Sequence, residues 1–196
     1  MYFLIVKPFF DKLFALLGIL ILSPLYVSVM LLLWTFQRGK VFFVQDRIGF
    51  KRKVFRIIKF RTMEGEEGMP GSSQAAERLT SMGKLLRRTS LDELPQLWNV
   101  IAGEMSLIGP RPLPVEYLNL FSTEQDKRHD VRPGITGWTQ VNGRHELSWT
   151  QKFELDLYYV NNLSFRLDLL ILFKTVILLL AFKKDNSLSE KPFTGN

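Results

Sequence analysis

The hydrophobic pattern of the chain begins with one long apolar run, Leu13 to Phe36, which holds no charged residue. Its 24 residues are enough to span the hydrocarbon core of a bilayer as a helix. The run is too long for a cleaved signal peptide, and no small-residue cleavage site follows it. Ser23 and Pro24 stand in its middle. A proline there removes one helical hydrogen bond, so we expect a kink, with the Ser23 hydroxyl bonding the freed carbonyl.

Basic residues flank this run on both sides, so the positive-inside rule does not decide its orientation. Lys7 and Lys12 precede it, and Arg38, Lys40 and Arg47 are the first to follow it. Two arrangements fit. The helix either crosses the bilayer once, or it enters, bends at the Ser-Pro pair and returns to the same face. The residues alone favour a single crossing, because kinked spanning helices are common.

The rest of the pattern predicts short strands and helices. Near-alternate apolar residues in 41–61 indicate two short strands joined around Gly49. Helical spacing predicts helices over residues 75–88, 94–101, 115–128, 149–160 and 165–182. The last is apolar but contains Lys174, which would be costly to bury in lipid, so we expect it to lie along the interface with Lys174 snorkelling. Residues 64–73 have the composition of a mobile loop, a candidate lid over a site.

Charge is distributed unevenly along the 196 residues, a length that suits one domain with an appendage. Residues 1–61 hold eleven Lys and Arg against two acids, whereas the remainder holds fifteen against seventeen. The basic charge therefore lies beside the apolar run, which indicates an anionic lipid surface before nucleic acid. The chain contains no cysteine, which excludes disulfides, thiolate metal sites and thiol nucleophiles.

The strongest candidate for chemistry is the segment 89–112. Asp92 and Glu93 open a helical stretch in which Pro95 fits the first turn and Ser90 or Asp92 can act as the cap. The N-terminus of a helix attracts anions and metal-bound phosphates. A capped helix with acidic residues in its first turn is the ordinary alternative. The apolar face that we expect to be buried comprises Leu94, Leu97, Trp98 and Ile101.

Arginines and a glycine-rich segment surround this stretch. The prolines of the turn Gly109 to Pro112 stiffen the backbone around Arg111, which suits bidentate phosphate binding. Residues 131–144 form tight turns, which either approach a ligand or merely connect elements. They bring together Arg132, Gln140, Asn142 and Arg144. His129 and His145 lack metal-ligand spacing, so we expect surface or supporting roles for them.

Four stretches resemble the bacterial sugar transferase family, in the family's order. They are KFRTM (59–63), SLDELPQLWNV (90–100), GEMSLIGPRP (103–112) and RPGITGWTQVNGR (132–144). The chain is similar to the small monotopic phosphoglycosyl transferases of the PglC type over nearly its whole length. Larger members of the family carry additional N-terminal spanning helices, for which this chain has no room, so we expect a stand-alone transferase.

This resemblance implies a fold and a membrane topology. The expected fold is helix-rich α+β, with interfacial amphipathic helices and a small cytosolic catalytic domain that contains short β-strands. The family's N-terminal helix is re-entrant and breaks at a Ser-Pro pair, which matches Ser23 and Pro24, so the re-entrant arrangement replaces the single crossing. The expected parts are a membrane helix at 1–38, a catalytic domain at 39–182 and a frayed polar tail at 183–196. The implied location is the cytoplasmic face of a bacterial inner membrane.

The resemblance also implies a reaction. Such enzymes move a sugar 1-phosphate from a UDP-sugar to undecaprenyl phosphate, release UMP, use Mg²⁺ and begin glycoconjugate assembly. The sugar expected first is an N-acetylated one, and a homodimer is plausible. The family's catalytic pair falls on Asp92 and Glu93, which are also the candidate Mg²⁺ ligands. Asp92 would attack the sugar-linked phosphorus to form a covalent intermediate, and Glu93 would take a proton from the polyprenol phosphate.

Residues of the surrounding segments complete the expected site. Those expected to bind the donor's phosphates and nucleotide are Arg111, Arg87, Lys59, Gln140 and Arg144. Asp168 is expected to support the acidic pair. Two other interpretations remain: a membrane-bound Mg²⁺-dependent UDP-sugar pyrophosphatase that uses water as the acceptor, and a basic scaffold without catalytic activity that binds anionic lipid or nucleic acid.

Overall fold

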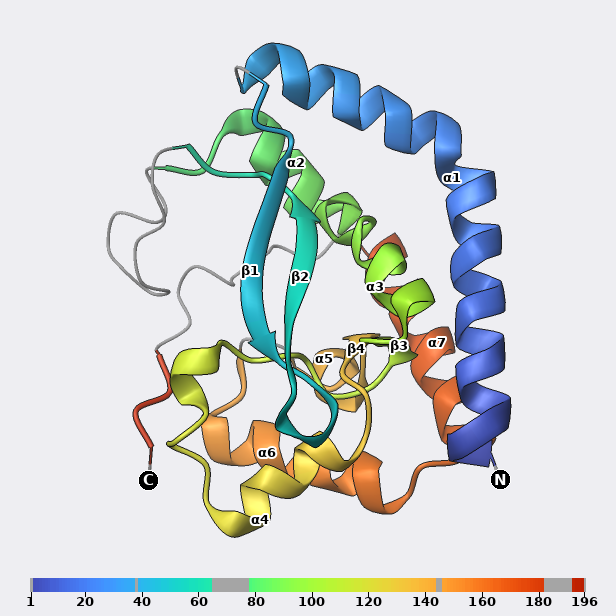
Figure 1. Ribbon diagram of the computed structural model, residues 1–196, viewed down its shortest axis with the longest axis vertical. Helices are drawn as coiled ribbons and strands as arrows, with labels where there is room; N and C mark the ends of the chain where they lie inside the picture. The colour runs from blue at the N-terminus through green and yellow to red at the C-terminus, as the bar shows by residue number, and fades with distance from the viewer. Residues whose placement is uncertain (1, 38, 65–77, 144–145, 182–191, 196) are drawn as a thin grey trace.

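The computed structural model describes residues 2–37, 39–64, 78–143, 146–181 and 192–195. A π-helical turn, η1 (Tyr2–Val6), leads into the long helix α1 (Lys7–Phe36), which bends midway and curves around one side of the molecule (Figure 1). Pro24 lies inside α1, and the Ser23 hydroxyl donates to the Leu20 carbonyl at 2.8 Å. That carbonyl is the one that Pro24 leaves without an N–H, so the predicted kink chemistry is confirmed.

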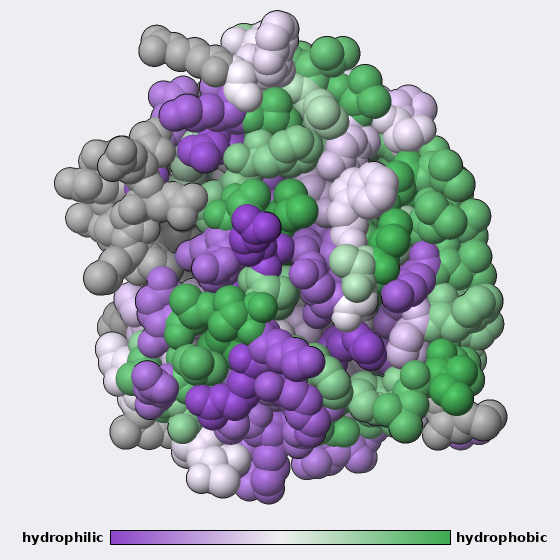
Figure 2. All heavy atoms as spheres, viewed as in Figure 1, coloured by the Kyte–Doolittle hydropathy of each residue, from purple (hydrophilic) through white to green (hydrophobic). Residues whose placement is uncertain are grey.

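Helix α1 is also the part of the described chain best suited to a bilayer. Together with η1 it forms the one described helix, Tyr2–Phe36, that is long and apolar enough to cross a membrane. Most of its large apolar side chains are exposed, and in Figure 2 they form a hydrophobic margin along one side of the molecule. This exposure distinguishes α1 from the core helix of a soluble protein, which would bury the same residues.

The predicted pair of strands is confirmed. Strands β1 (Phe42–Ile48) and β2 (Val54–Phe60) form an antiparallel hairpin in which Phe42 pairs with Phe60 and Ile48 with Val54. The turn η2 (Phe50–Arg52) closes the hairpin, and its Lys51 and Arg52 have positive φ of 53° and 62°. Phe55 and Ile57 turn inward to one core cluster, whereas Phe60 joins another that includes Leu33 of α1.

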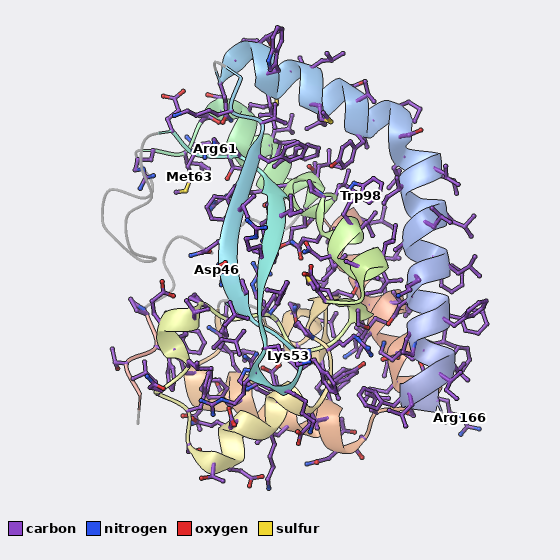
Figure 3. The ribbon with its side chains drawn as sticks, viewed as in Figure 1. Asp46, Lys53, Arg61, Met63, Trp98 and Arg166 are labelled. Carbon is purple, nitrogen blue, oxygen red and sulfur yellow. The ribbon has the colours of Figure 1, made fainter. Side chains whose placement is uncertain are left out.

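The central segment folds differently from its expected single helix. Helix α2 (Ser81–Arg88) is followed by the 3₁₀ turn η4 (Leu91–Glu93) and then by α3 (Gln96–Ala102). Neither Ser90 nor Asp92 caps α3, which begins after Pro95 without a side-chain cap, so that expectation was wrong. Trp98 was wrongly expected to be buried: it is 48% exposed, and Figure 3 places it on the side of α3 that faces the inner curve of α1.

Two short strands bring the glycine-rich segment to the central one. Strand β3 (Ser106–Ile108) pairs in parallel with β4 (Gly134–Thr136), in the register Ser106 to Gly134. The backbones approach closely here, because a Cβ on Gly134 would lie 2.1 Å from the Gly109 amide nitrogen. Glycine is therefore required at this position, and the turn 109–112 is held against the segment 131–137.

The stretch expected as a helix over 115–128 is broken into short pieces. These are the 3₁₀ turn η5 (Val115–Tyr117), the helical turn α4 (Thr123–Asp126) and the 3₁₀ turn η6 (Lys127–Asp130). After the turn α5 (Trp138–Val141), the predicted helices α6 (Trp149–Asn161) and α7 (Phe165–Leu180) follow with nearly the expected bounds. Their N-termini are capped by Ser148 and Ser164.

Helix α7 exposes apolar side chains along much of its length, as expected for an interfacial helix, but Lys174 does not extend toward water. Its ammonium donates to Asn142 Oδ1 at 2.9 Å and lies 4.7 Å from the centre of the Trp138 ring. The predicted snorkelling is therefore wrong, because a cation–π contact with Trp138 and the amide of Asn142, which follows α5, hold the ammonium against the protein.

The described end of the C-terminal tail is ordered rather than frayed. Phe193 is 4% exposed and packs among the rings of Tyr117, Phe121, Trp149 and Phe153. Its amide donates to the Tyr117 hydroxyl at 3.1 Å. Residues 183–191 of the predicted tail, and nearly all of the predicted lid at 64–73, lie outside the described residues.

Candidate active site

The two acidic residues lie on the turn η4, between α2 and α3. Ser90 enters this turn with a φ of 57°, a left-handed conformation that a residue with a Cβ seldom adopts. The turn directs Asp92 and Glu93 toward strand β2 and the turn 109–112, where cations approach them. The acidic pair thus sits on a tight and strained connection rather than in the first turn of a regular helix.

Glu93 is held by two cations from distant segments. Its Oε1 accepts from Lys59 Nζ of β2 at 2.7 Å and from Arg111 Nη1 at 3.3 Å. Burial alone would raise the pKa of Glu93, but Lys59 and Arg111 outweigh it and lower the pKa to about 2. Burial in turn lowers the pKa of Lys59. Glu93 is therefore an anion at any physiological pH.

Asp92 has a different environment. The side chain is buried, and this burial is the main cause that raises its pKa to about 6, with the neighbouring Glu93 acting in the same direction. Lys59, Arg87 and Arg111 oppose the rise. One carboxylate of the pair is thus fixed as an anion and the other titrates near neutrality, a separation that is typical of paired catalytic carboxyl groups.

Arg87 reaches the site from the last turn of α2. Its Nε donates to Thr62 Oγ1 at 3.0 Å. Helix α2 lies directly against the segment after β2, because a Cβ on Gly83 would lie 2.0 Å from the Thr62 carbonyl oxygen. The Thr80 side chain caps the helix by accepting from the Gly83 amide at 2.9 Å. Gly83 and Thr62, which sequence reasoning did not identify as site residues, therefore set the position of Arg87.

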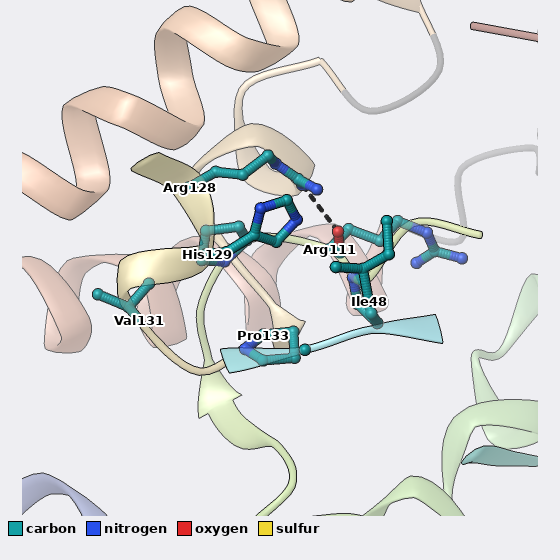
Figure 4. Close-up of a pocket in the computed structure, with 9 residues that line it drawn as sticks. Ile48, Arg111, Arg128, His129, Val131 and Pro133 are labelled. Atoms are coloured by element: carbon teal, nitrogen blue, oxygen red, sulfur yellow. Dashed lines mark hydrogen bonds between the residues drawn. The ribbon is translucent and has the colours of Figure 1, made fainter. Parts of the chain in front are cut away.

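The turn that carries Arg111 is held by two further arginines. Arg128 Nη2 donates to the Arg111 carbonyl at 2.8 Å, the bond drawn in Figure 4. Arg47 Nη1 donates to the next carbonyl, that of Pro112, at 3.2 Å. The Arg111 side chain itself is 42% exposed. The turn's backbone is therefore anchored while its guanidinium faces both Glu93 and solvent.

A small pocket opens beside this turn, lined by residues of β1, η6 and the turn itself (Figure 4). His129 lines it and is buried, contrary to a surface position. Burial and the neighbouring Arg128 lower the pKa of His129 to about 4, so its ring is neutral. The Nδ1 atom lies 3.1 Å from two acceptors of Asp126, so it carries the proton.

The structure does not bring every predicted site residue to the acidic pair. Asp168 accepts hydrogen bonds from Lys7 at 2.9 Å, Tyr2 at 2.6 Å and Tyr159 at 2.7 Å, so it joins α7 to the start of α1. The amide atoms of Gln140 are buried and have no hydrogen-bond partner among the described residues. Arg144 and His145 lie outside the described residues.

The donor set at the acidic pair suits magnesium better than a transition metal. Within the described ranges, no cluster of three or more His, Cys, Asp or Glu side chains is present. Mg²⁺ prefers oxygen ligands, is usually held by one or two protein carboxylates, and takes its other ligands from water and substrate phosphates. Asp92 and Glu93 offer that number of carboxylates, with Lys59 and Arg111 beside Glu93.

Comparison with known proteins gives a consistent match. A model of the bacterial sugar transferase family matches residues 2–182. The uncharacterized sugar transferase EpsL of Bacillus subtilis is 50% identical over 80% of this chain and 79% of its own length. The exopolysaccharide production protein ExoY of Sinorhizobium fredii is 38% identical over 87% of this chain and 83% of its own.

A longer relative carries a more specific name. The UDP-N-acetylgalactosamine-undecaprenyl-phosphate N-acetylgalactosaminephosphotransferase of Aeromonas hydrophila is 40% identical over 87% of this chain, which corresponds to 43% of that protein.

Proposed function

The chain belongs to the bacterial sugar transferase family, and on that premise we propose that it transfers a sugar 1-phosphate from a UDP-sugar to undecaprenyl phosphate. Relatives named for this type of reaction include the Aeromonas hydrophila protein and the UDP-glucose:undecaprenyl-phosphate glucose-1-phosphate transferase of Escherichia coli, which is 40% identical over 85% of this chain. The observation that carries the proposal is the geometry of the acidic pair: Glu93 accepts from Lys59 at 2.7 Å and from Arg111 at 3.3 Å, and its neighbour Asp92 is buried. Burial of Asp92 raises its pKa, while the cations lower the pKa of Glu93.

The reaction proceeds in two displacements. In the first, an Asp92 carboxylate oxygen attacks the phosphorus that bears the sugar, an O–P bond forms, and the bridging P–O bond breaks so that UMP leaves with the electron pair. In the second, a phosphate oxygen of undecaprenyl phosphate attacks the same phosphorus and releases Asp92. Splitting one transfer into two steps is the general advantage of a covalent nucleophile.

The cations around the pair make this attack feasible. A carboxylate that approaches a diphosphate is repelled, and fixed positive charge at the site offsets that repulsion. Lys59 is already committed to Glu93 at 2.7 Å, whereas the half-exposed Arg111 is placed to contact the phosphates of the donor. Asp92 and Glu93 would hold Mg²⁺, which supplies charge neutralisation for the leaving UMP.

We propose that α1 is re-entrant, entering and leaving on the cytoplasmic face of a bacterial inner membrane, and that it holds the site at the depth of the lipid headgroups. The bend of α1 at its Ser-Pro pair and the basic residues on both flanks support this arrangement. The phosphate of a membrane-embedded polyprenol lies at headgroup depth, so a site beside the concave side of α1 needs no extraction of the lipid.

The donor sugar is proposed to be N-acetylated. The Aeromonas hydrophila relative is named for N-acetylgalactosamine, whereas the Escherichia coli relative is named for glucose. A panel of UDP-sugars with detection of released UMP distinguishes the two classes, and a clear preference for UDP-glucose would contradict the proposal.

The covalent scheme is tested by intact-mass analysis. Incubation with UDP-sugar alone is expected to add one phosphosugar to the native enzyme but not to Asp92→Asn, whose transfer rate falls by about 10³-fold or more because its nucleophile is lost. Asp46→Asn, at an exposed carboxylate on β1, is the matched control. It should still gain the phosphosugar mass and keep the native transfer rate.

Dependence on the acceptor distinguishes the proposed transferase from a UDP-sugar pyrophosphatase, which uses water. The proposed transferase releases UMP in multiple turnovers only when undecaprenyl phosphate is added. Steady UMP release without any acceptor, or full transfer by Asp92→Asn, refutes the proposed mechanism.

A further inference from the structure

A buried ion pair adjoins the turn that carries Arg111. Arg128 of η6 donates to Asp156 Oδ2 of α6 from Nε at 3.0 Å and from Nη2 at 2.7 Å. Both residues are 4% exposed. The second carboxylate oxygen of Asp156 accepts from Thr139 Oγ1 of α5 at 2.6 Å. Residues of η6, α6 and α5, which contribute nothing to the acidic pair, are therefore linked in one buried chain of hydrogen bonds centred on Asp156.

The same guanidinium is also bonded to the site. Besides its bonds to Asp156, Arg128 Nη2 donates to the carbonyl oxygen of Arg111 at 2.8 Å (Figure 4). Arg111 stands between Pro110 and Pro112, neither of which has an amide hydrogen to donate. A turn with so few donors of its own depends on outside donors to hold its carbonyls, and Arg128 supplies one of them.

Stability alone is a weak reason to bury this pair. Removing two charges from water costs several kcal/mol per ion, and replacing a buried pair by apolar side chains of similar volume is often neutral or stabilising. A planar guanidinium with fixed donors can, however, hold a carboxylate and a carbonyl in one rigid geometry. We therefore expect the ion pair Arg128–Asp156 to serve mainly to hold the turn that carries Arg111 in position.

We propose that Arg128 and Asp156 are positioning residues for Arg111: they fix the backbone of its turn so that the guanidinium is aimed at Glu93 and the donor phosphates. This inference rests on the proposed function. Arg111 Nη1 lies 3.3 Å from Glu93 Oε1 while 42% of the side chain is exposed, so the position of its main chain contributes to where the guanidinium points. A displacement of about 1 Å at a reacting site typically costs about 10²-fold in rate.

The test is the double variant Arg128→Met/Asp156→Leu, which removes both charges and leaves neither ion buried alone. Thr139 retains a bond to the Lys152 carbonyl. We expect a thermal midpoint close to that of the native enzyme, but a kcat/KM for the UDP-sugar about 10- to 100-fold lower. The loss appears as a raised KM for the donor, with the KM for undecaprenyl phosphate unchanged. General damage to the fold would affect both substrates.

Arg128→Lys is the conservative second variant. A lysine retains a charge opposite Asp156 but lacks the fork that reaches both the carboxylate and the Arg111 carbonyl, so we expect a smaller loss of the same kind, about tenfold. The matched control is Arg52→Met. Arg52 also joins an aspartate, Asp126 at 2.9 Å, to a main-chain carbonyl, that of Leu118 at 3.0 Å, but on the exposed hairpin tip. The Arg52→Met variant should keep the native KM for the UDP-sugar.

A double-mutant cycle decides whether the pair acts through Arg111. In an Arg111→Ala background the same double variant should cost less than about threefold, because the side chain that it positions is absent. Native donor kinetics in Arg128→Met/Asp156→Leu, or an undiminished loss in the Arg111→Ala background, overturns the inference. If the native enzyme itself transfers no phosphosugar, the proposed function fails instead.

Discussion

The buried carboxylate of Asp92 should destabilise the folded protein at neutral pH, and replacing it by the amide should reveal how much. Burial raises the pKa of Asp92 from an ordinary value of 3.8 to about 6. Between these values the folded protein retains a proton that the unfolded chain has already lost. Because the folded state then binds more protons, stability falls as the pH rises through this window.

The size of this effect follows from the shift. About two pKa units correspond to at most roughly 3 kcal/mol of unfolding free energy. For a chain of this length that is about 6–12 °C in thermal midpoint. The cost is small near pH 4, which lies just above the ordinary pKa of 3.8, and complete above about pH 7. Asp92→Asn does not titrate, so its advantage over the native protein should grow by most of this amount between pH 4 and pH 8.

The assay is thermal unfolding of both proteins in the same detergent across that range, with a chelator present so that no divalent ion neutralises the carboxylate. Comparing the two proteins cancels the titrating groups that do not interact with Asp92. Asp46→Asn, at an exposed position, should give a curve parallel to the native one. If the Asp92→Asn curve is parallel as well, Asp92 is not a buried charge and the assignment of the titrating nucleophile is wrong.

Two further predictions concern the supports of the site. Lys59→Met removes the cation closest to the acidic pair, so the transfer rate should fall by about 10²–10³-fold. Because Lys59 lowers the pKa of Asp92, the acid limb of the pH–rate profile of the residual activity should move up by about 1–3 pH units. An acid limb that does not move contradicts the electrostatic account. Gly83→Ala should lower both the thermal midpoint and the transfer rate, since its Cβ would lie 2.0 Å from the Thr62 carbonyl oxygen and displace Arg87. Gly18→Ala is the control and should be tolerated, because its Cβ would lie 3.5 Å from the Leu97 side chain.

Local features of the chain were predictable because their causes are local. The bend of α1 follows from a missing amide at Pro24 and the adjacent hydroxyl of Ser23, which are neighbours in the sequence. The hairpin β1–β2 follows from alternate apolar residues on either side of a short turn. The acidic pair and Arg111 were identified by motif, and the contact of Glu93 with Lys59 and Arg111 agrees with a shared site.

Other features depend on partners that the sequence does not reveal. Helical spacing marks an apolar face but not what covers it, so Trp98 was assigned to the core although it lies half-exposed on the side facing α1. The buried pair Arg128–Asp156 joins two residues 28 positions apart in unrelated patterns. Nothing in the sequence around Arg128, beside a histidine, or around Asp156, within an amphipathic helix, indicates that the two side chains form a contact.

Asp168 shows how a functional expectation can fail while the residue remains important. It lies 161 positions from Lys7, yet the two form a buried ion pair at 2.9 Å, and Lys7 lies 3.8 Å from Asp11. Asp11 in turn accepts from Ser106 of β3 at 2.7 Å. Strand β3 leads directly into the turn of Arg111, so one buried polar cluster connects the start of α1, α7 and the strand before that turn. These polar contacts therefore fix the start of α1 against α7 and β3, while apolar packing in two core clusters holds the rest of α1 against α3 and β2.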